Sequence, residues 1–349
     1  MIEFDSVTKR YPDGTMAVDG LSVTAPSHRI TVFVGPSGCG KTTSLRMINR
    51  MIDPTEGRIT IDGEDVSTQP PALLRRSIGY VIQHGGLFPH RTVLDNVATV
   101  PVLSGTTRRA ARAAALDLLD RVGLSSELGD RYPAQLSGGQ QQRVGVARAL
   151  AADPPVLLMD EPFSAVDPVV REDLQNELLR LQADLAKTIV MVTHDIDEAI
   201  KLGDRVAVFA AGGRIAQYDT PEDLLANPAD GFVRGFVGRD RGYRGLSFAD
   251  ASEVPVAPVG TEIEGLTLLR DADGRPTAWR GPAGEWPVSG TFTVGDSVRR
   301  VADLVLLSPA SAAVRVDGAG RADGIVGHAR LAAYVRDRQL ALLENGEPV

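Results

Sequence analysis

A glycine-rich loop sets the first limit on what this chain can fold into. It follows the apolar run Ile30–Val34, precedes a stretch with helical spacing from Ser44 to Met51, and reads Gly35-Pro36-Ser37-Gly38-Cys39-Gly40-Lys41-Thr42. This is the pattern GxxxxGK[ST] in the strand-to-helix context that identifies a phosphate-binding P-loop. Its backbone N–H groups can point at one anion, and the following helix adds its positive N-terminal end. The alternative, an ordinary glycine-rich turn, is disfavoured by this context.

Side chains of this loop have predicted roles toward a nucleotide. Lys41 is expected to reach the β- and γ-phosphates, and the hydroxyl of Thr42 is expected to bind Mg²⁺. Thr43 is expected to contact the α-phosphate. Cys39, inside the loop, is predicted to be a small residue that fits the space, with a reactive thiol as the alternative.

A second run ends in two adjacent carboxylates and complements the P-loop. It reads Val156-Leu157-Leu158-Met159-Asp160-Glu161. Asp160 is predicted to hold Mg²⁺ directly or through water, because this ion prefers oxygen ligands. Glu161 is predicted to face the γ-phosphate and to polarise the attacking water, since the turn at the end of a strand can re-aim the next side chain.

A second anion-binding helix start is predicted further along the chain. It reads Leu136-Ser137-Gly138-Gly139-Gln140 and is followed by Gln141-Gln142-Arg143. Serine and two glycines before a helix favour phosphate binding at the helix N-terminus. Two such loops in one chain indicate a head-to-tail dimer, in which the loop of one subunit closes over the nucleotide of the other. The alternative is an ordinary Ser-Gly helix cap.

Composition narrows the class of protein. The 349 residues suggest about two domains. The net charge of −8 argues against a nucleic-acid partner. The longest stretch without a charge or histidine, Asn96–Thr107, is too short to span a membrane, and no N-terminal segment resembles a signal peptide. The single cysteine excludes an internal disulfide and a cysteine-based zinc cluster, so a reducing cytosol is expected.

Strands and helices alternate over the first ~240 residues. A mainly parallel sheet, covered on both faces, is predicted because several strands are unbroken apolar runs. A helix is predicted at Thr107–Val122, and another over Val170–Leu185, where leucines recur at helical intervals as a core face. Besides Ile30–Val34, strands are expected at Ile2–Val7, Ala17–Thr24, Arg58–Ile61, Ile78–Ile82, Val156–Met159, Ile189–Val192 and Val206–Phe209.

A change in composition near Arg239 predicts a domain boundary. Gly238–Gly245 is rich in glycine and arginine and is interpreted as a linker, and a second domain follows from Leu246. This domain contains an internal echo at an offset of 46 residues, in which Leu269–Arg275 resembles Arg315–Arg321. Each copy is predicted to be a strand that ends in a polar hairpin turn.

With every motif in order, residues 1–240 resemble the ATP-binding-cassette (ABC) ATPases. The resemblance implies an α/β fold: a P-loop ABC nucleotide-binding domain with a RecA-like core, an antiparallel β subdomain and a helical subdomain at about 87–150. A small C-terminal α+β domain at 241–349 is expected beside it. The family is ATP-hydrolysing and uses ATP and Mg²⁺.

The family's roles apply to matching positions of this sequence. The resemblance implies that Tyr11 stacks on adenine, and that Ser137, Gly139 and Gln140 close on the γ-phosphate of the opposite subunit. It implies that Gln83 touches Mg²⁺ and water and senses the membrane partner. Ser164-Ala165-Val166-Asp167 matches the loop that couples the two sites, and His194 matches the switch histidine. The predicted catalytic residues are Glu161, His194, Gln83 and Lys41, and the predicted metal ligands are Thr42, Gln83 and Asp160.

One branch of the family is favoured. Gly86–His90, in the run Ile78–His90, and the later Asn96–Pro101 look like the glycine betaine/carnitine/choline importers, with Leu87 and Phe88 as apolar anchors for a permease or, alternatively, as core residues. The resemblance implies a homodimer, or a pair with a related cassette, beneath transmembrane permease subunits at the cytoplasmic face of the membrane. An extracytoplasmic solute-binding protein would act indirectly.

Alternatives remain open at this stage. They are an importer of polyamines, sugars or methionine, an exporter subunit, a soluble cassette acting on chromosomes or ribosomes, and a nucleotide-binding regulator without turnover. The tail resembles a degenerate pair of CBS modules, in which Gly327 and Arg330 occupy the positions where a Thr and an Asp usually hold an adenosyl ligand. A role in sensing ionic strength or in steadying the dimer is therefore expected in place of adenosine sensing, with a packing appendage as the alternative.

Overall fold

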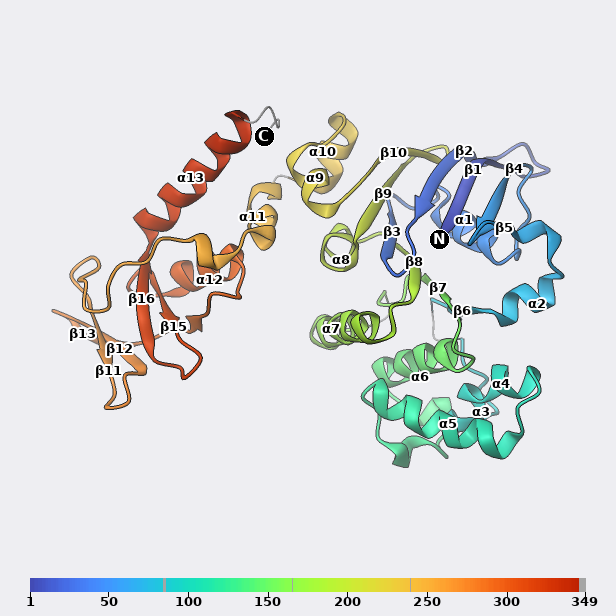
Figure 1. Cartoon of the computed structure of the whole chain (residues 1–349), viewed down its shortest axis with the longest axis horizontal. Coiled ribbons are helices and arrows are strands. Elements are labelled where there is room, and N and C mark those ends of the chain that lie inside the picture. The colour runs from blue at the N-terminus through green and yellow to red at the C-terminus, as the bar shows by residue number, and fades with distance from the viewer. Residues whose placement is uncertain (84–85, 165, 239, 345–349) are drawn as a thin grey trace. The chain divides into compact units, whose positions relative to one another are not determined.

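Two compact units make up the described chain. The structure, a computed structural model, describes residues 1–83, 86–164, 166–238 and 240–344. The first unit holds residues 1–224 and 229–236, and the second holds residues 225–228 and those from 237 onward. The boundaries fall within α9 (Pro221–Ala226), between residues 228 and 229, and before the last residue of α10 (Gly231–Val237). Figure 1 labels the elements of both units.

The first unit is built on a six-stranded sheet with the order β10-β9-β3-β8-β7-β6. Neighbours from β9 to β6 run parallel, and β10 pairs antiparallel with β9. Every residue of β3, β7 and β8 is buried, which confirms the predicted doubly covered sheet. The strands are β3 (Ile30–Val34), β6 (Ile78–Val81), β7 (Val156–Asp160), β8 (Thr188–Thr193), β9 (Arg205–Ala210) and β10 (Arg214–Asp219).

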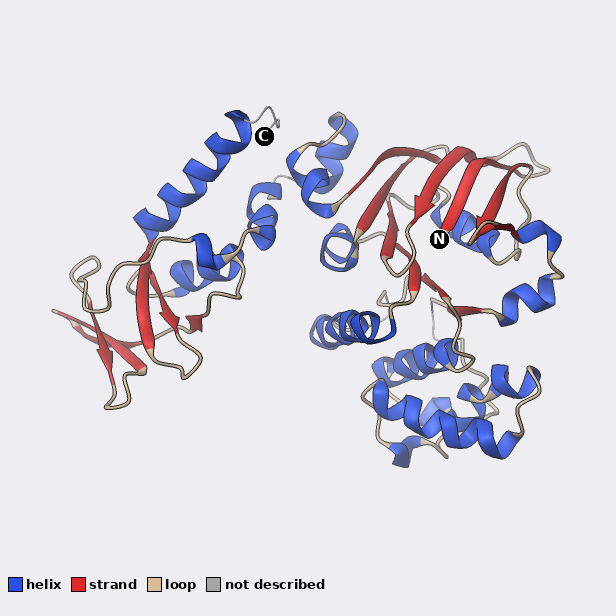
Figure 2. Ribbon diagram, in the orientation of Figure 1, coloured by secondary structure: helices blue, strands red, loops and turns tan. Residues whose placement is uncertain are grey.

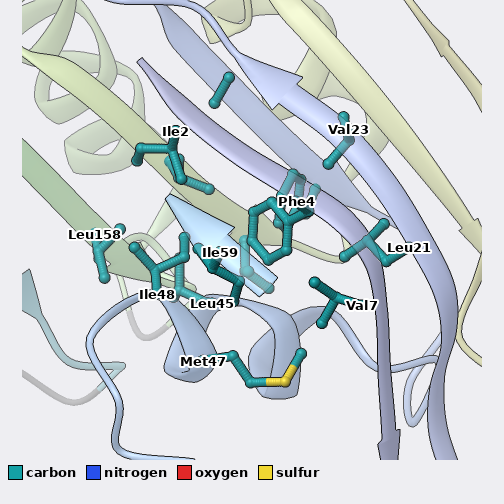
Figure 3. Packing of buried hydrophobic residues seen from close by; sticks show 14 of the residues in the cluster. Ile2, Phe4, Val7, Leu21, Val23, Leu45, Met47, Ile48, Ile59 and Leu158 are labelled. Carbon is teal, nitrogen blue, oxygen red and sulfur yellow. The ribbon is translucent and has the colours of Figure 1, made fainter. Parts of the chain in front are cut away.

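A separate antiparallel sheet covers the first helix. Its order is β2 (Met16–Ala25), β1 (Ile2–Arg10), β4 (Glu56–Ile61) and β5 (Glu64–Asp65). Figure 3 shows Phe4 of β1 and Ile59 of β4 packing with Leu45 and Ile48 of α1 (Lys41–Ile48) in one buried cluster. Leu158 of the parallel sheet belongs to the same cluster, so α1 is held between the two sheets.

The helix after the P-loop differs from the prediction at both ends. It was expected from Ser44 to Met51, but α1 begins at Lys41 and ends at Ile48. It begins earlier because Gly40 takes a left-handed φ of 99° as the residue before the helix, and Gly40 O accepts the Ser44 N–H. It ends earlier because Arg50 turns the chain at a φ of 55°.

The remaining helices of this unit flank the sheet or gather in a helical subdomain. Beside the sheet lie α2 (Pro71–Arg76), α7 (Pro168–Leu185) and α8 (Ile196–Leu202). The subdomain contains α3 (Val93–Val97), α4 (Thr99–Leu103), α5 (Arg108–Arg121) and α6 (Gly138–Leu150), grouped away from the strands in Figure 2. The predicted leucine stripe of α7 is confirmed as a core face, because Leu174, Leu178 and Leu181 are buried.

The second unit contains two three-stranded sheets. One is the antiparallel sheet of β11 (Thr267–Arg270), β12 (Pro276–Gly281) and β13 (Gly284–Pro287). In the other, β15 (Ala312–Val316) pairs parallel with β14 (Thr291–Phe292) and antiparallel with β16 (Ala322–Gly327). Helices α12 (Val298–Leu307) and α13 (His328–Glu344) lie in the same stretch of chain as the strands of this second sheet. The elements of that stretch follow one another in the order β-α-β-β-α.

The repeat in the tail is confirmed at its turns. Asp271 begins one hairpin turn and Asp317 begins the other. In each, the aspartate N–H donates to the carbonyl of the arginine four residues later, and the aspartate Oδ1 accepts that arginine's N–H. The two turns lie side by side, because Ala322 N donates to Gly274 O at 3.0 Å.

The predicted linker Gly238–Gly245 is wrong for its second half. Arg241–Gly245 forms α11 and belongs to the second unit. Its glycines do not prevent a helical turn because Arg244 pairs with Asp240 and donates to the Val237 carbonyl, while Tyr243 packs against that unit's core.

Among the residues described, no helix combines the length and the apolar character that a membrane crossing requires.

Candidate functional site

Four neighbouring strands bring the predicted site residues to one edge of the parallel sheet. The strands β3, β8, β7 and β6 are adjacent and parallel, so their carboxyl ends meet at the same edge. The P-loop follows β3, His194 follows β8, Glu161 follows β7, and Gln83 lies in the turn after β6. Open α/β sheets bind ligands at this edge, so the predicted residues converge where a site is expected.

The P-loop has the backbone conformation that its glycines permit. Gly40 has a φ of 99°, and a Cβ atom there would lie 2.1 Å from Ala17 O. A Cβ atom on Gly35 would lie 2.4 Å from Phe209 O. Pro36, Ser37 and Gly38 form the exposed arch of the loop. A side chain at either position would collide with these carbonyl oxygens, so only glycine fits at positions 35 and 40. The loop can therefore lie directly against the backbone of the strands that carry Ala17 and Phe209.

Lys41 and Cys39 are the two side chains of the loop that are buried. The Lys41 Nζ donates to Gly35 O at 2.8 Å and to Pro36 O at 2.9 Å. Its positive charge therefore lies inside the arch formed by the loop. Cys39 is 2% exposed and belongs to the hydrophobic core of this unit, which favours the packing interpretation of that residue.

Asp160 and Thr42, two of the predicted metal ligands, are in direct contact. The Thr42 Oγ1 donates to Asp160 Oδ1 at 2.9 Å, and Asp160 is buried. The other carboxylate oxygen, Oδ2, accepts from Tyr80 Oη at 3.3 Å and from Arg46 at 3.4 Å. The carboxylate is thus held on one side and presents Oδ1 to the threonine.

Glu161 is turned toward Gln83 and His194. It has a left-handed φ of 45°, and its N–H donates to Val192 O at 2.9 Å. Because of this turn its side chain leaves the strand direction set by Asp160, as predicted. The Gln83 Nε2 donates to Glu161 Oε2 at 3.0 Å, and His194 Nδ1 lies 3.3 Å from the same oxygen. Two side chains that are far from Glu161 in the sequence therefore meet at one oxygen of its carboxylate.

The residues of the second anion loop form a helix start of their own. Ser137 is the N-cap of α6: its Oγ accepts from Gln140 N, and Gln140 Oε1 accepts from Ser137 N. A Cβ atom on Gly139 would lie 2.7 Å from Val170 Cγ1. Within the described ranges, no hydrogen bond joins Ser137 or Gln140 to the P-loop of the same chain, so the structure does not bring the two anion loops together in one subunit.

The other predicted residues lie near the site but have no described contact that tests their roles. Tyr11 follows β1, with the Lys9 Nζ 5.5 Å from its ring centre. Asp167 is the N-cap of α7, where its side chain accepts from Val170 N. Thr43 is half-buried in the first turn of α1. Ala165, in the loop before Asp167, lies outside the described residues, as do His84 and Gly85.

Sequence reasoning missed Arg46 and Tyr80, the two residues that hydrogen-bond to Oδ2 of Asp160. Arg46 lies four residues after Thr42 on α1 and therefore shares its helix face. Tyr80 pairs in register with Leu158, which shares a strand face with Asp160. Burial, together with the nearby Asp160 charge, raises the pKa of the Tyr80 phenol, so it remains a hydrogen-bond donor at neutral pH. Both residues could have been found from these spacings, but only with the strand order in hand.

Comparison with known proteins identifies the family. The sequence profile described as "ABC transporter" matches residues 18–164. The choline transport ATP-binding protein OpuBA of Bacillus subtilis is 52% identical over 241 residues, which cover 69% of this chain and 63% of the relative. The osmoprotectant import ATP-binding protein OsmV of Salmonella typhimurium is 42% identical over 369 aligned residues, covering 96% of each chain. This chain therefore spans less than two thirds of OpuBA and nearly all of OsmV.

Solved structures show the same fold. The ATP-binding cassette MJ0796, seen as a dimer in a post-hydrolysis state bound to ADP and Pi, is 33% identical with a TM-score of 0.58; the match covers 63% of this chain and 99% of that one. The cassette cbiO1 from Clostridium perfringens is 30% identical with a TM-score of 0.60, and the match covers 65% of this chain and 90% of that one. The motifs, the strand order and these relatives show that the chain belongs to the family of ABC transporter ATP-binding proteins.

Proposed function

We propose that this chain is the ATP-hydrolysing subunit of a binding-protein-dependent ABC importer for quaternary amine osmoprotectants of the glycine betaine, carnitine and choline type. The observation that carries ATP hydrolysis is the convergence of Gln83 and His194 on one oxygen of Glu161. Such a carboxylate is oriented to polarise an attacking water molecule. The P-loop after β3, which pairs with the strand that precedes His194, supplies the phosphate site.

The residues at the strand ends fit a Mg²⁺ ion. The Thr42 hydroxyl and the Asp160 carboxylate are hard oxygen ligands in mutual contact, and Gln83 adds an amide oxygen nearby. When bound, the ion neutralises charge that develops on the phosphoryl oxygens. Lys41 brings its charge to the loop, Glu161 accepts the proton of the attacking water, and His194 contacts the γ-phosphate and orients Glu161.

The names of the relatives support the cargo class. OpuBA is a choline transport protein, OsmV is an osmoprotectant import protein, and the relative YehX of Escherichia coli, 48% identical over 276 residues, is named for glycine betaine uptake. The match to OsmV extends through the second unit, so it does not rest on the cassette alone.

Partners and location follow from this proposal. We expect a homodimer, or a pair with a related cassette, beneath transmembrane permease subunits at the cytoplasmic face of the membrane, with an extracytoplasmic solute-binding protein acting indirectly and no nucleic-acid partner. A surface groove of the helical subdomain, lined in part by Phe88, Val102, Leu103 and Tyr132, would receive the permease. Phe88 is 40% and Leu103 is 59% exposed, so both are free to contact an apolar partner.

We propose that residues 246–349 of the second unit resemble a degenerate pair of CBS modules that adjusts activity to ionic strength or steadies the dimer. Its duplicated turns and the β-α-β-β-α order of its second half support this. Deletion of residues 246–349 tests the sensing version: uptake by the shortened protein should lose its dependence on salt. An unchanged salt response would leave only a stabilising role.

The main test compares uptake of labelled glycine betaine at high osmolarity in cells that lack the gene and carry wild type, Glu161→Gln or the control Glu172→Gln. Glu172 is exposed on α7 and pairs with Lys201, so its amide variant controls for the loss of one carboxylate. Glu161→Gln should bind ATP, accumulate as a closed dimer and abolish uptake, while Glu172→Gln should retain it. Uptake that persists in Glu161→Gln cells would refute the proposed cargo. A Glu161→Gln protein that stays monomeric in excess MgATP would refute the motor scheme.

A further inference from the structure

We propose that Arg171 is a positioning residue for ATP hydrolysis. It ties the loop after Glu161 to the loop that carries His194 and thereby sets the separation of these two side chains. The inference rests on the proposed function, because it concerns the geometry of that reaction. Among the described residues, the Arg171 side chain makes no hydrogen bond or ion pair with the P-loop, Glu161 or His194, and its backbone N–H donates to Asp167 O at 2.9 Å.

The guanidinium of Arg171 reaches two segments of the chain, through one backbone carbonyl on the first and two carboxylates on the second. Its NH2 group donates to Val166 O at 3.2 Å, at the end of the loop that begins with Glu161. Its NH1 lies 3.7 Å from Asp195 Oδ2, and its Nε lies 4.0 Å from Glu198 Oε1. Arginine suits such a position because its planar fork presents several donors in fixed directions.

The acceptors on the histidine side are themselves held in place. Asp195 directly follows His194 and is the N-cap of α8, where its carboxylate accepts from the backbone N–H groups of Asp197 and Glu198. The Asp195 N–H donates to Thr193 Oγ1 at 3.0 Å, and that hydroxyl donates to Glu198 Oε2 at 2.7 Å. The backbone on both sides of His194 is therefore fixed to the start of α8.

Burial and charge strengthen this arrangement. Glu198 is 5% exposed, and burial raises the pKa of its carboxyl. The Thr193 hydroxyl and the Arg171 guanidinium oppose that rise. Arg171 therefore supplies the positive charge that faces both Asp195 and Glu198.

These contacts close a ring around the proposed catalytic pair. At its base, Glu161 N donates to Val192 O. At its far side, Arg171 joins Val166 to Asp195, and across its middle His194 Nδ1 faces Glu161 Oε2 at 3.3 Å. Without Arg171 the two loops stay joined at the base but can separate at the far side. The expected consequence is a misplaced His194 with an intact phosphate site.

The test is the steady-state kinetics of MgATP hydrolysis by the full chain, together with MgATP binding and thermal unfolding. Arg171→Met should lower kcat about tenfold, since small misplacements of positioned groups cost that much or more. KM and the MgATP Kd should stay within about twofold, because the P-loop contacts are untouched. Arg180→Met is the matched control: Arg180 lies on the same helix, is itself exposed, pairs with Glu177, and should behave as wild type.

Two more variants make the test independent of how well the first one folds. Arg171→Lys keeps the charge but lacks the planar fork that reaches three acceptors at once, so its kcat should lie between those of wild type and Arg171→Met. Asp195→Asn keeps the capping oxygen and removes the charge. It should lower kcat, and combining it with Arg171→Met should add less than about twofold, as expected for two ends of one contact.

The outcomes separate this inference from the function beneath it. A wild-type protein that does not hydrolyse MgATP would overturn the proposed function and, with it, this inference. An active wild type with an unchanged kcat in Arg171→Met would overturn the inference alone. A parallel loss of kcat, MgATP affinity and melting temperature would show that Arg171 only stabilises the fold.

Discussion

Ser137 has a structural task that can be separated from its proposed functional one. Its Oγ accepts from Gln140 N at 3.3 Å as the N-cap of α6, and Gln140 Oε1 accepts from Ser137 N at 2.9 Å. Ser137→Ala removes the first bond and leaves the second. Ser137→Asp supplies a carboxylate that caps a helix as well as serine does. Ser137→Ala is therefore expected to lose stability without a change in charge. Ser137→Asp is expected to keep its stability and to add a negative charge.

The expected magnitudes follow from this geometry. Loss of a capping oxygen costs about 0.5–2 kcal/mol, and the length of this bond points to the lower half of that range. For a unit of this size about 1 kcal/mol lowers the melting temperature by roughly 2–4 °C. Ser137→Asp should melt within about 1 °C of wild type, because a negative charge at a helix N-terminus is favourable.

ATP hydrolysis should rank the two variants in the opposite order from stability. In the proposed dimer this helix start faces the γ-phosphate of the other subunit. Ser137→Ala loses one hydrogen bond to a charged group, which corresponds to a loss of about ten- to a hundredfold in kcat/KM. Ser137→Asp places a carboxylate against phosphate and should lose more activity, although it is the more stable variant.

Melting temperature and MgATP hydrolysis, measured on the same preparations, test this reasoning. If the residue served only as a cap, activity would follow stability, and Ser137→Asp would hydrolyse ATP like wild type. That result would refute the proposed phosphate contact. A Ser137→Ala protein that melts like wild type would refute the capping argument.

Two further predictions concern the loop and the helical subdomain. Gly40→Ala should abolish MgATP binding in a fluorescence titration, because its Cβ would lie 2.1 Å from Ala17 O; wild-type affinity would contradict this. Burial raises the pKa of Asp95, but hydrogen bonds from Arg112 and Arg108 outweigh it, so the folded pKa is lowered. This stabilisation is present above the unfolded pKa and is lost as pH falls through the folded pKa. Asp95→Asn should therefore lower the free energy of unfolding in urea by about 2 kcal/mol at pH 7, and this difference from wild type should shrink below about pH 4. A difference that stays constant with pH would contradict the argument.

The sequence was informative wherever neighbouring residues determine the structure. The apolar run Ile30–Val34 became a fully buried strand with the predicted bounds, because every residue of a doubly covered strand must be apolar or paired. The placement of Glu161 also followed, since a polar residue directly after such a strand must turn away from its neighbour. Its left-handed φ of 45° is the conformation that achieves this.

The sequence was uninformative where a contact depends on the order of strands. Nothing in the spacing of Arg46, Tyr80 and Asp160 brings them together until β6 is known to lie beside β7. Arg171 lies on the predicted helix Val170–Leu185, and its contacts with Val166 and Asp195 become visible only when α7 and α8 are placed. Such residues act across the fold and therefore carry no local signature.

The proposed CBS interpretation of the second unit predicts that contacts within the chain take the place of an adenosyl site. On that interpretation, Gly327 stands where the pattern usually has a threonine, and a Cβ atom there would lie 3.3 Å from Ile263 Cγ2. Arg330 stands at the usual aspartate position and donates to Val256 O. Both positions are thus occupied by contacts within the chain. The turns at Asp271 and Asp317 are joined by the hydrogen bond from Ala322 N to Gly274 O, and with both pattern positions changed we expect no adenosyl ligand to bind this unit.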